Sequence, residues 1–179
     1  MNKQGCWLAL ALALLGAVVG TGPVSAVDLN FSGTLIDKQC TFAQGDDPLE
    51  VDMLSRAVSF FHRYPRTETV PFDIVLKNCT GATQDKLVMM TFSGTQTEAV
   101  GGVTLLKTDG GTGILIGLEG ASGQAISVGS PVNAGTITQT GAAGENRFRF
   151  GAYAQGPADL STLAEGAYTA TTTFEVTYQ

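Results

Sequence analysis

The sequence predicts an all-β protein, an antiparallel sandwich of immunoglobulin type. Short runs in which apolar and polar residues alternate recur along the chain, and this period of two is typical of strands with one buried face. Turn residues separate the runs, as in "TDGGTG", "EGASG" and "TGAAGEN". About seven short strands with hardly any helical pattern are typical of such a sandwich.

The first 26 residues have the pattern of a secretory signal peptide. Lys3 lies in a short polar start, an apolar run extends from Cys6 to Val19, and the segment ends in the small-x-small motif Val24-Ser25-Ala26. We expect cleavage after Ala26. The alternative, a membrane anchor, is disfavoured because the apolar run is short for a span and ends in a good cleavage site.

Composition indicates one secreted domain. Cleavage would leave 153 of the 179 residues, which is enough for a single domain with its own core. The chain has 16 acidic and 10 basic residues, and loss of Lys3 would change its net charge from −6 to −7. An acidic surface argues against a nucleic-acid partner. No later segment is long and apolar enough to cross a membrane, so we expect no membrane insertion.

The expected mature chain begins with a strand-like segment, "VDLNFSGTL". One side of it would carry Val27, Leu29, Phe31, Gly33 and Leu35, and the other side polar residues. Taken alone, this segment could be an ordinary first strand of the sandwich.

Strand patterns fill the middle of the chain. In "TVPFDIVLKNC" the apolar residues Val70, Phe72, Ile74 and Leu76 alternate, and in "NRFRFGAYA" Phe148 and Phe150 alternate with arginines. "KLVMMTFSG" and "GILIGLEG" are apolar runs closed by glycine. Only "PADLSTLAEG" suggests a helical turn, with Asp159 as its cap.

The last strand continues to the end of the sequence. One face would carry Tyr168, Ala170, Thr172, Phe174, Val176 and Tyr178, and small or polar residues alternate with them up to Gln179. No turn or partner strand follows. The sequence therefore predicts a half-buried strand with a long open edge, which β domains ordinarily avoid.

Two cysteines remain in the expected mature chain. Cys6 would leave with the signal peptide, and Cys40 and Cys79 would reach an oxidising compartment, where we expect them to form a disulfide. Closing this loop would stabilise the fold by about 4 kcal/mol in the chain-entropy model.

No catalytic, cofactor or metal site emerges. His62 is the only histidine, and it is better interpreted as a surface residue than as part of a catalytic triad. "DGGTGILIG" fits neither a P-loop nor a dinucleotide fingerprint, and a flexible hairpin is the simpler interpretation. The acidic turn at Asp46, Asp47, Glu50 and Asp52 matches no calcium-loop template. We expect a protein that is not an enzyme.

Both ends of the chain and its cysteine pair resemble the pilus subunits of the chaperone–usher pathway. The matching segments are "FSGTLIDKQC", "FDIVLKNC" and "GAYTATTTFEVTYQ", in which Gly166 stands fourteenth from the end and the penultimate residue, Tyr178, is aromatic. Within this family the chain most resembles the tip-fibrillum adaptor of P pili, through "SFFHRYPRTETVPFDIVLKNC" and "TFEVTY".

The resemblance implies an incomplete immunoglobulin-like sandwich that lacks its final strand. Residues 1–26 would be the signal peptide, 27–36 an N-terminal donor-strand extension and 37–179 the pilin domain. The missing strand would leave a groove beside the last strand, and the acceptor residues would be Gly166, Tyr168, Ala170, Thr172, Phe174, Val176, Tyr178 and Gln179.

The resemblance also implies the partners. A periplasmic chaperone would first insert a strand parallel to the last strand and anchor the terminal carboxylate of Gln179. At the outer-membrane usher, the extension of the next subunit would replace it, running antiparallel. The chain's own extension would fill a neighbour's pockets with Val27, Leu29, Phe31, Gly33 and Leu35. The protein would thus be exported to the periplasm and then become extracellular in the pilus.

Three functions stay open at this point. The preferred one is a structural pilus subunit of the minor tip-adaptor type, and a major rod subunit of the same family is the second. The third is a free secreted immunoglobulin-like binding module, which would need a complete sandwich.

Overall fold

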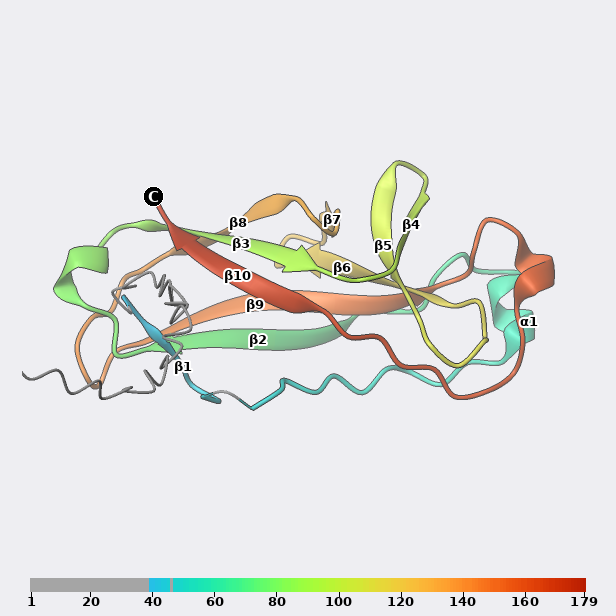
Figure 1. Cartoon of the computed structure of the whole chain (residues 1–179), viewed down its shortest axis with the longest axis horizontal. Coiled ribbons are helices and arrows are strands. Elements are labelled where there is room, and N and C mark those ends of the chain that lie inside the picture. The colour runs from blue at the N-terminus through green and yellow to red at the C-terminus, as the bar shows by residue number, and fades with distance from the viewer. Residues whose placement is uncertain (1–38, 46) are drawn as a thin grey trace, which may run out of the picture. The chain divides into compact units, whose positions relative to one another are not determined.

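The computed structural model describes residues 39–45 and 47–179, in which ten strands form two antiparallel sheets (Figure 1). The larger sheet has the order β1-β2-β9-β6-β5-β4, with β7 also paired to β6. Its strands are β1 (Thr41–Phe42), β2 (Val70–Lys77), β4 (Thr97–Val100), β5 (Val103–Lys107), β6 (Leu115–Gly120), β7 (Ala125–Ile126) and β9 (Glu145–Gln155). The smaller sheet has the order β10-β3-β8 and comprises β3 (Leu87–Ser93), β8 (Pro131–Thr136) and β10 (Thr173–Tyr178).

Helical structure is confined to three short pieces of the described chain: α1 (Val58–Phe61) and the 3-10 turns η1 (Gly81–Thr83) and η2 (Leu160–Thr162). The turn expected in "PADLSTLAEG" is η2, and the Asp159 side chain accepts a hydrogen bond from the backbone N–H of Ser161. No helix within residues 39–45 and 47–179 is long and apolar enough to span a membrane.

The first part of β9 follows the predicted alternation. In β9, Phe148 and Phe150 are buried while Arg147 and Arg149 face solvent. The neighbouring β2 pairs with β9 over its whole length, from Val70↔Ala152 to Lys77↔Glu145. Which face of each strand is buried constrains the register of such a pair.

The core consists of apolar side chains from the inner faces of both sheets. Its largest fully buried side chains include Phe92, Ile74, Leu76 and Met90. Phe92 of the smaller sheet meets Phe150 of the larger sheet edge to face, with ring centroids 5.2 Å apart. This contact fixes the two sheets face to face.

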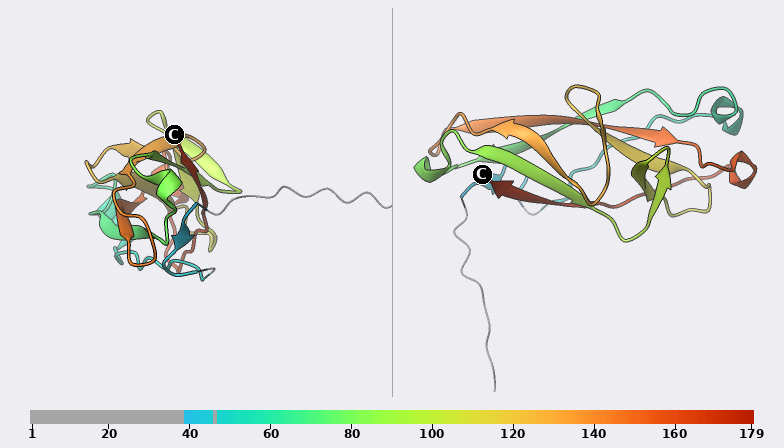
Figure 2. Two further views of the ribbon diagram at one scale, coloured as in Figure 1. Left: turned by 90° about the vertical axis from the view of Figure 1, so that its left-hand side faces the viewer. Right: turned by 90° about the horizontal axis from the view of Figure 1, so that it is seen from above.

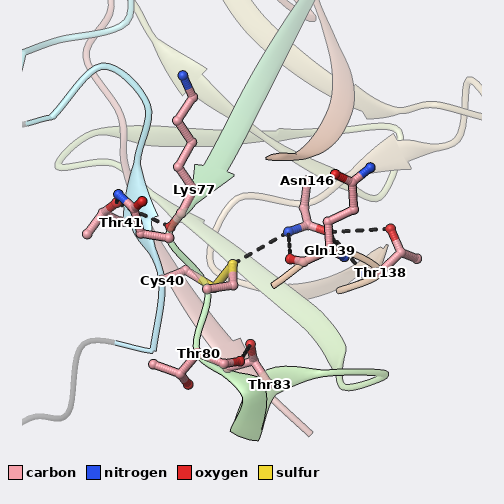
Figure 3. The surroundings of a disulfide bond; sticks show 10 residues. Cys40, Thr41, Lys77, Thr80, Thr83, Thr138, Gln139 and Asn146 are labelled. Carbon is pink, nitrogen blue, oxygen red and sulfur yellow. Dashed lines mark hydrogen bonds between the residues drawn. A yellow bond between two sulfur atoms is a disulfide. The ribbon is translucent and has the colours of Figure 1, made fainter. Parts of the chain in front are cut away.

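A disulfide bond joins Cys40, just before β1, to Cys79, just after β2 (Figure 3). Cys79 is almost fully buried. Beside it, the buried Asn146 side chain accepts backbone hydrogen bonds from Thr138 (2.9 Å) and Gln139 (3.0 Å). The disulfide therefore holds the first strand of the described chain against a hydrogen-bonded end of the sandwich.

An ion pair holds the segment after α1 against the larger sheet. Arg66 donates to Glu119 of β6 (2.8 Å), Thr69 donates to the same carboxylate (2.6 Å), and the Arg66 guanidinium lies 4.2 Å from the Tyr153 ring centroid. Burial raises the pKa of Glu119, but the hydrogen bonds from Thr69 and Arg66 outweigh it, so the net pKa is lowered. The carboxylate thus stays charged and anchors this segment.

We expect the cysteine pair to be oxidised in the secreted protein. Thiol labelling of the denatured, unreduced protein should find neither Cys40 nor Cys79 free, whereas reduction should expose both. Replacing both with alanine should lower the free energy of unfolding by about 2–4 kcal/mol, because the unfolded chain regains the entropy of an open loop. Labelling of both sites without reductant would contradict the bond.

Glu119→Gln should lower the free energy of unfolding at pH 7 by about 1–3 kcal/mol, since a charge-assisted hydrogen-bond network is lost. A carboxyl whose pKa is lowered on folding stabilises above its unfolded value, near 4.5, and this contribution disappears as the pH falls through the folded pKa. The difference in the free energy of unfolding between wild type and Glu119→Gln should therefore become smaller as the pH falls. Urea unfolding from pH 7 to pH 3 measures it, and a difference independent of pH would refute the assignment.

Candidate functional site

The last strand has one open edge. β10 pairs with β3 through six consecutive residues, from Thr173↔Ser93 to Tyr178↔Val88, and Gln179 continues the ladder with two 2.9 Å backbone hydrogen bonds to Leu87. In the described part of the chain, no strand pairs with its other side. The right-hand view of Figure 2 shows the C-terminus at the end of this edge. A free row of backbone donors and acceptors is therefore available there.

Two other sheet edges, those of β8 and β4, are less suited to pairing. β8 begins with Pro131, which has no N–H, and its register with β3 shifts between Val88 and Met89. β4 is short, and its Glu98 forms an ion pair with Lys107. β10 thus offers a longer regular edge than β8 or β4.

β10 presents an apolar row that the fold covers only in part. Phe174, Val176 and Tyr178 are half-buried and pack against the core, while Thr173, Glu175 and Thr177 are exposed. Partial burial raises the pKa of the Tyr178 hydroxyl. The edge therefore combines free backbone groups with incompletely buried side chains, which is what an added strand would need.

The chain between β1 and α1 flanks this last segment at both ends. Near β1, the rings of Phe42 and Phe174 meet edge to face with centroids 5.2 Å apart. Near α1, Leu54 and Tyr168 line a common cavity. Val51 and Met53, between these two points, are half-buried against the core.

The cavity has a volume of about 230 Å³ and lies where the last segment begins. Most of its lining residues are of apolar type, and Arg56 and Glu165 are the charged members. The lining residues are Leu54, Arg56, Ala57, Val58, Phe61, Thr112, Ile114, Leu163, Ala164, Glu165, Gly166 and Tyr168. A cavity of this size can hold one large apolar side chain.

The acceptor residues expected from the sequence fall into two groups. Thr172, Phe174, Val176 and Tyr178 are half-buried in or beside β10, and Gln179 extends its ladder. Gly166 and Tyr168 line the cavity instead.

The predicted strand is longer than the observed one. The observed strand, β10, begins at Thr173 rather than at the predicted Tyr168, and Ala170 is exposed. The reason is that the partner strand β3 ends at Ser93, opposite Thr173, so no neighbour remains to pair with the earlier residues.

Two predictions concern residues that the structure does not describe. The proposed donor residues Val27, Leu29, Phe31, Gly33 and Leu35 lie outside the described residues, as does the expected signal peptide.

The sequence did not point to the cavity walls contributed by α1 and by the β5–β6 loop. The apolar pair Phe60-Phe61 was the one local signal for the first wall.

The described residues show no arrangement typical of catalysis. His62 is exposed, and no group of three or more His, Cys, Asp or Glu residues in the described ranges could hold a metal ion. What the site can do chemically is add backbone hydrogen bonds and bury apolar side chains.

Comparison with known proteins matches this chain to a family model described as "Fimbrial protein" over residues 29–179. The fimbrial adapter PapK of Escherichia coli is 32% identical, and the match covers 93% of this chain and 96% of that protein. The major MR/P fimbria protein of Proteus mirabilis is 30% identical, covering 95% and 97%.

A solved structure gives the same result. A chain from the structure of a chaperone–usher pilus superimposes with a TM-score of 0.64 at 28% identity, covering 90% of this chain and all of that one. The expected fold, an immunoglobulin-like antiparallel sandwich, agrees with this similarity.

Phe174 should contribute to the stability of the fold. It belongs to the half-buried row of β10, and its ring contacts the rings of Phe42 and Phe92. Phe174→Ala should lower the free energy of unfolding by about 1–2 kcal/mol, because a half-buried aromatic ring is removed. The neighbouring Glu175 points away, so Glu175→Ala should change it by less than about 0.5 kcal/mol. Equal effects in urea unfolding would argue against the assigned faces of β10.

Proposed function

Because this chain belongs to the fimbrial protein family, the structural subunits of chaperone–usher pili, we propose that it is a minor tip adaptor that accepts a strand along β10 and donates its own N-terminal extension. It is a structural protein, as its relatives are, and not an enzyme. The observation that carries the strand-accepting part of the proposal is the open edge of β10 with its half-buried row of apolar side chains.

The donor extension suits this edge in length and pattern. Val27 and Leu35 are eight positions apart, as are Tyr178 and Ala170. An antiparallel strand with its first residue beside Tyr178 therefore brings the fifth inward residue to the level of Ala170, close to the cavity that Tyr168 lines. Burial of Leu29, Phe31 and Leu35 in a neighbour's groove would contribute about 5–9 kcal/mol before ordering costs.

The same edge would serve the periplasmic chaperone before assembly. A chaperone strand along β10 would cover the apolar row that is otherwise open to water. The backbone N–H and C=O of Gln179 both pair with Leu87, so a terminal carboxylate on Gln179 would lie at the end of the ladder. Basic side chains of the chaperone can reach such a carboxylate.

The route of the protein follows from these partners. Export by the signal peptide, with cleavage after Ala26, would deliver the mature chain to the periplasm. The usher in the outer membrane would then exchange the chaperone strand for a neighbouring subunit's extension, and the protein would become part of the extracellular pilus.

The adaptor role rests on a narrower basis than membership of the family. Identity to the adapter PapK is 32%, against 30% to the major MR/P fimbria protein. Deletion of the gene distinguishes the roles. Rods that assemble without normal tips identify an adaptor, whereas loss of all rods identifies a major rod subunit.

Expression of residues 27–179 with and without the chaperone tests the strand-accepting function. We expect aggregation or degradation of the subunit alone, and a soluble complex when the chaperone is present, because the apolar edge needs a cover. A chaperone-independent folded monomer would instead favour a free secreted binding module. Removal of Phe174–Gln179 should abolish co-purification with the chaperone.

Gly33→Val in the extension should block donation and leave acceptance intact. Valine favours strands, but the fourth inward position would face a part of the groove with hardly any room for a side chain. Peptides spanning Val27–Asp37 are mixed with the chaperone-bound preceding subunit, and chaperone release is followed. Wild type and Ser32→Val, which alters the outward face, should release it, and Gly33→Val should not. Equal release by all three peptides would leave Gly33 an ordinary strand residue.

A further inference from the structure

A second cleft lies along β8, at the edge of the smaller sheet that is remote from β10. Because β3 lies between β8 and β10, a strand added along β10 would not occupy it (Figure 1). The cleft has a volume of about 610 Å³, which is within the range of about 300–1,000 Å³ typical of small-molecule sites. We call it the β8 cleft, and its lining includes Gln124, Ser127, Val132, Asn133, Ala134 and Arg149.

The β8 cleft carries positive charge in a chain that is acidic as a whole. Arg149 is the one charged residue among those that line it in the described chain. Arg149 and Arg147 share the carboxylate of Asp73, at 3.0 Å and 3.2 Å, so two positive charges oppose one negative charge. The nearby Glu145 lies closer to Lys77 (2.7 Å) than to Arg147 (3.9 Å). The rim of the cleft is therefore suited to an anion.

The Arg149 guanidinium has donors to spare. Its Nε and Nη2 donate to Asp73, while its Nη1 makes no hydrogen bond to the residues that the structure describes. The side chain is 64% exposed, so Nη1 is open to a ligand. Planar guanidinium donors suit the oxygens of a carboxylate. Arg149 can thus bind a carboxylate without giving up its ion pair with Asp73.

Other polar groups of the β8 cleft also keep unused donors. The Asn133 Oδ1 accepts the backbone N–H two residues later (2.9 Å), which leaves its Nδ2 amide for a ligand. The Ser127 Oγ accepts a backbone N–H from β5 (3.1 Å), so its own O–H can donate elsewhere. Gln124 is exposed, and its side chain forms no hydrogen bond within the described ranges. Such a rim fits a ligand with several hydroxyl oxygens.

The cleft has a narrow apolar wall as well. Val132 and Ala134, on the inward side of β8, are half-buried and pack against the core. A purely apolar ligand could cover this wall but would leave the polar rim unpaired, which is unfavourable. A hexuronic acid combines a C–H face, several hydroxyl groups and one carboxylate, so it matches the wall, the rim and Arg149 together.

We propose that the β8 cleft binds a sugar acid of the hexuronic class. Arg149 holds its carboxylate, Gln124 and Asn133 hold its hydroxyl groups, and Val132 and Ala134 meet its C–H face. Arg149 is the specificity-determining residue, because it distinguishes a sugar acid from the neutral sugar. The site is separate from the β10 edge and remains open when that edge is filled.

Titration of the full mature chain, in its complex with the chaperone, tests the proposal. The ligands are D-glucuronate and D-glucose, which differ by a carboxylate in place of a hydroxymethyl group, and the isolated chaperone is the blank. Glucuronate should bind at least about tenfold more tightly than glucose, because glucose lacks the charge-assisted hydrogen bond to Arg149. If the mature chain folds without the chaperone, the same titration is made on the free chain.

Two variants locate the binding. Arg149→Gln should weaken glucuronate binding about tenfold and abolish the preference over glucose. The matched control Arg147→Gln removes the other guanidinium from Asp73 but lies outside the cleft lining, and it should change binding less than about twofold. Gln124→Ala, an exposed position that does not affect folding, should weaken binding of both sugars about threefold.

Three results would overturn the proposal: no binding of glucuronate, equal loss in Arg149→Gln and Arg147→Gln, or binding of acetate as tight as that of glucuronate. The last result would identify a bare anion site in which the hydroxyl groups play no part. A disaccharide with terminal glucuronate distinguishes two sources of the ligand. Tighter binding than glucuronate itself assigns the site to an acidic polysaccharide, and equal binding assigns it to the free sugar acid.

Discussion

The fold depends on a half-buried edge that has no partner strand within the described residues. Phe174, Val176 and Tyr178 reach the core from β10, but each remains partly open to water. Hydrophobic burial is the main favourable term in folding, and this row of side chains realises only part of it within the described residues. Phe174 links this edge to the centre through Phe92, which packs in turn on Phe150. Filling the edge would therefore add to the same core that holds the two sheets together.

The chain segments beside this edge are held at its two ends by different interactions. At one end the disulfide between Cys40 and Cys79 fixes the chain next to β1. Towards the other end, the ion pair of Arg66 with Glu119 holds the chain that follows α1. A covalent bond is indifferent to pH in this range, whereas the Glu119 contribution weakens in acid. The stability at the α1 end is therefore the more sensitive of the two to pH.

Sequence patterns predicted the strands where burial alternates and failed where tertiary contacts decide. The alternation in the first part of β9 and in β10 follows from one buried face, so residues such as Phe148 and Phe174 could be assigned to the core side. The start of β10 could not, because it is set by where β3 ends. The cavity was also missed, since it joins α1, Thr112 and Tyr168, which are remote in sequence and carry no common pattern. The hairpin expected in the glycine-rich loop is present, but its contact with Ala167 has no local signal.

The unequal sheet edges bear on the geometry of polymerisation. Pro131 and the register shift interrupt β8, and the ion-paired Glu98 lies on the short β4, whereas β10 is regular over its whole length. A building block with a single acceptor and a single donor has a valence of two. Such blocks form unbranched threads, whereas a third usable edge would let the threads join sideways into sheets or amorphous aggregates. If the chain accepts one strand and donates one, as proposed, the interruptions of β8 and β4 favour an unbranched fibre.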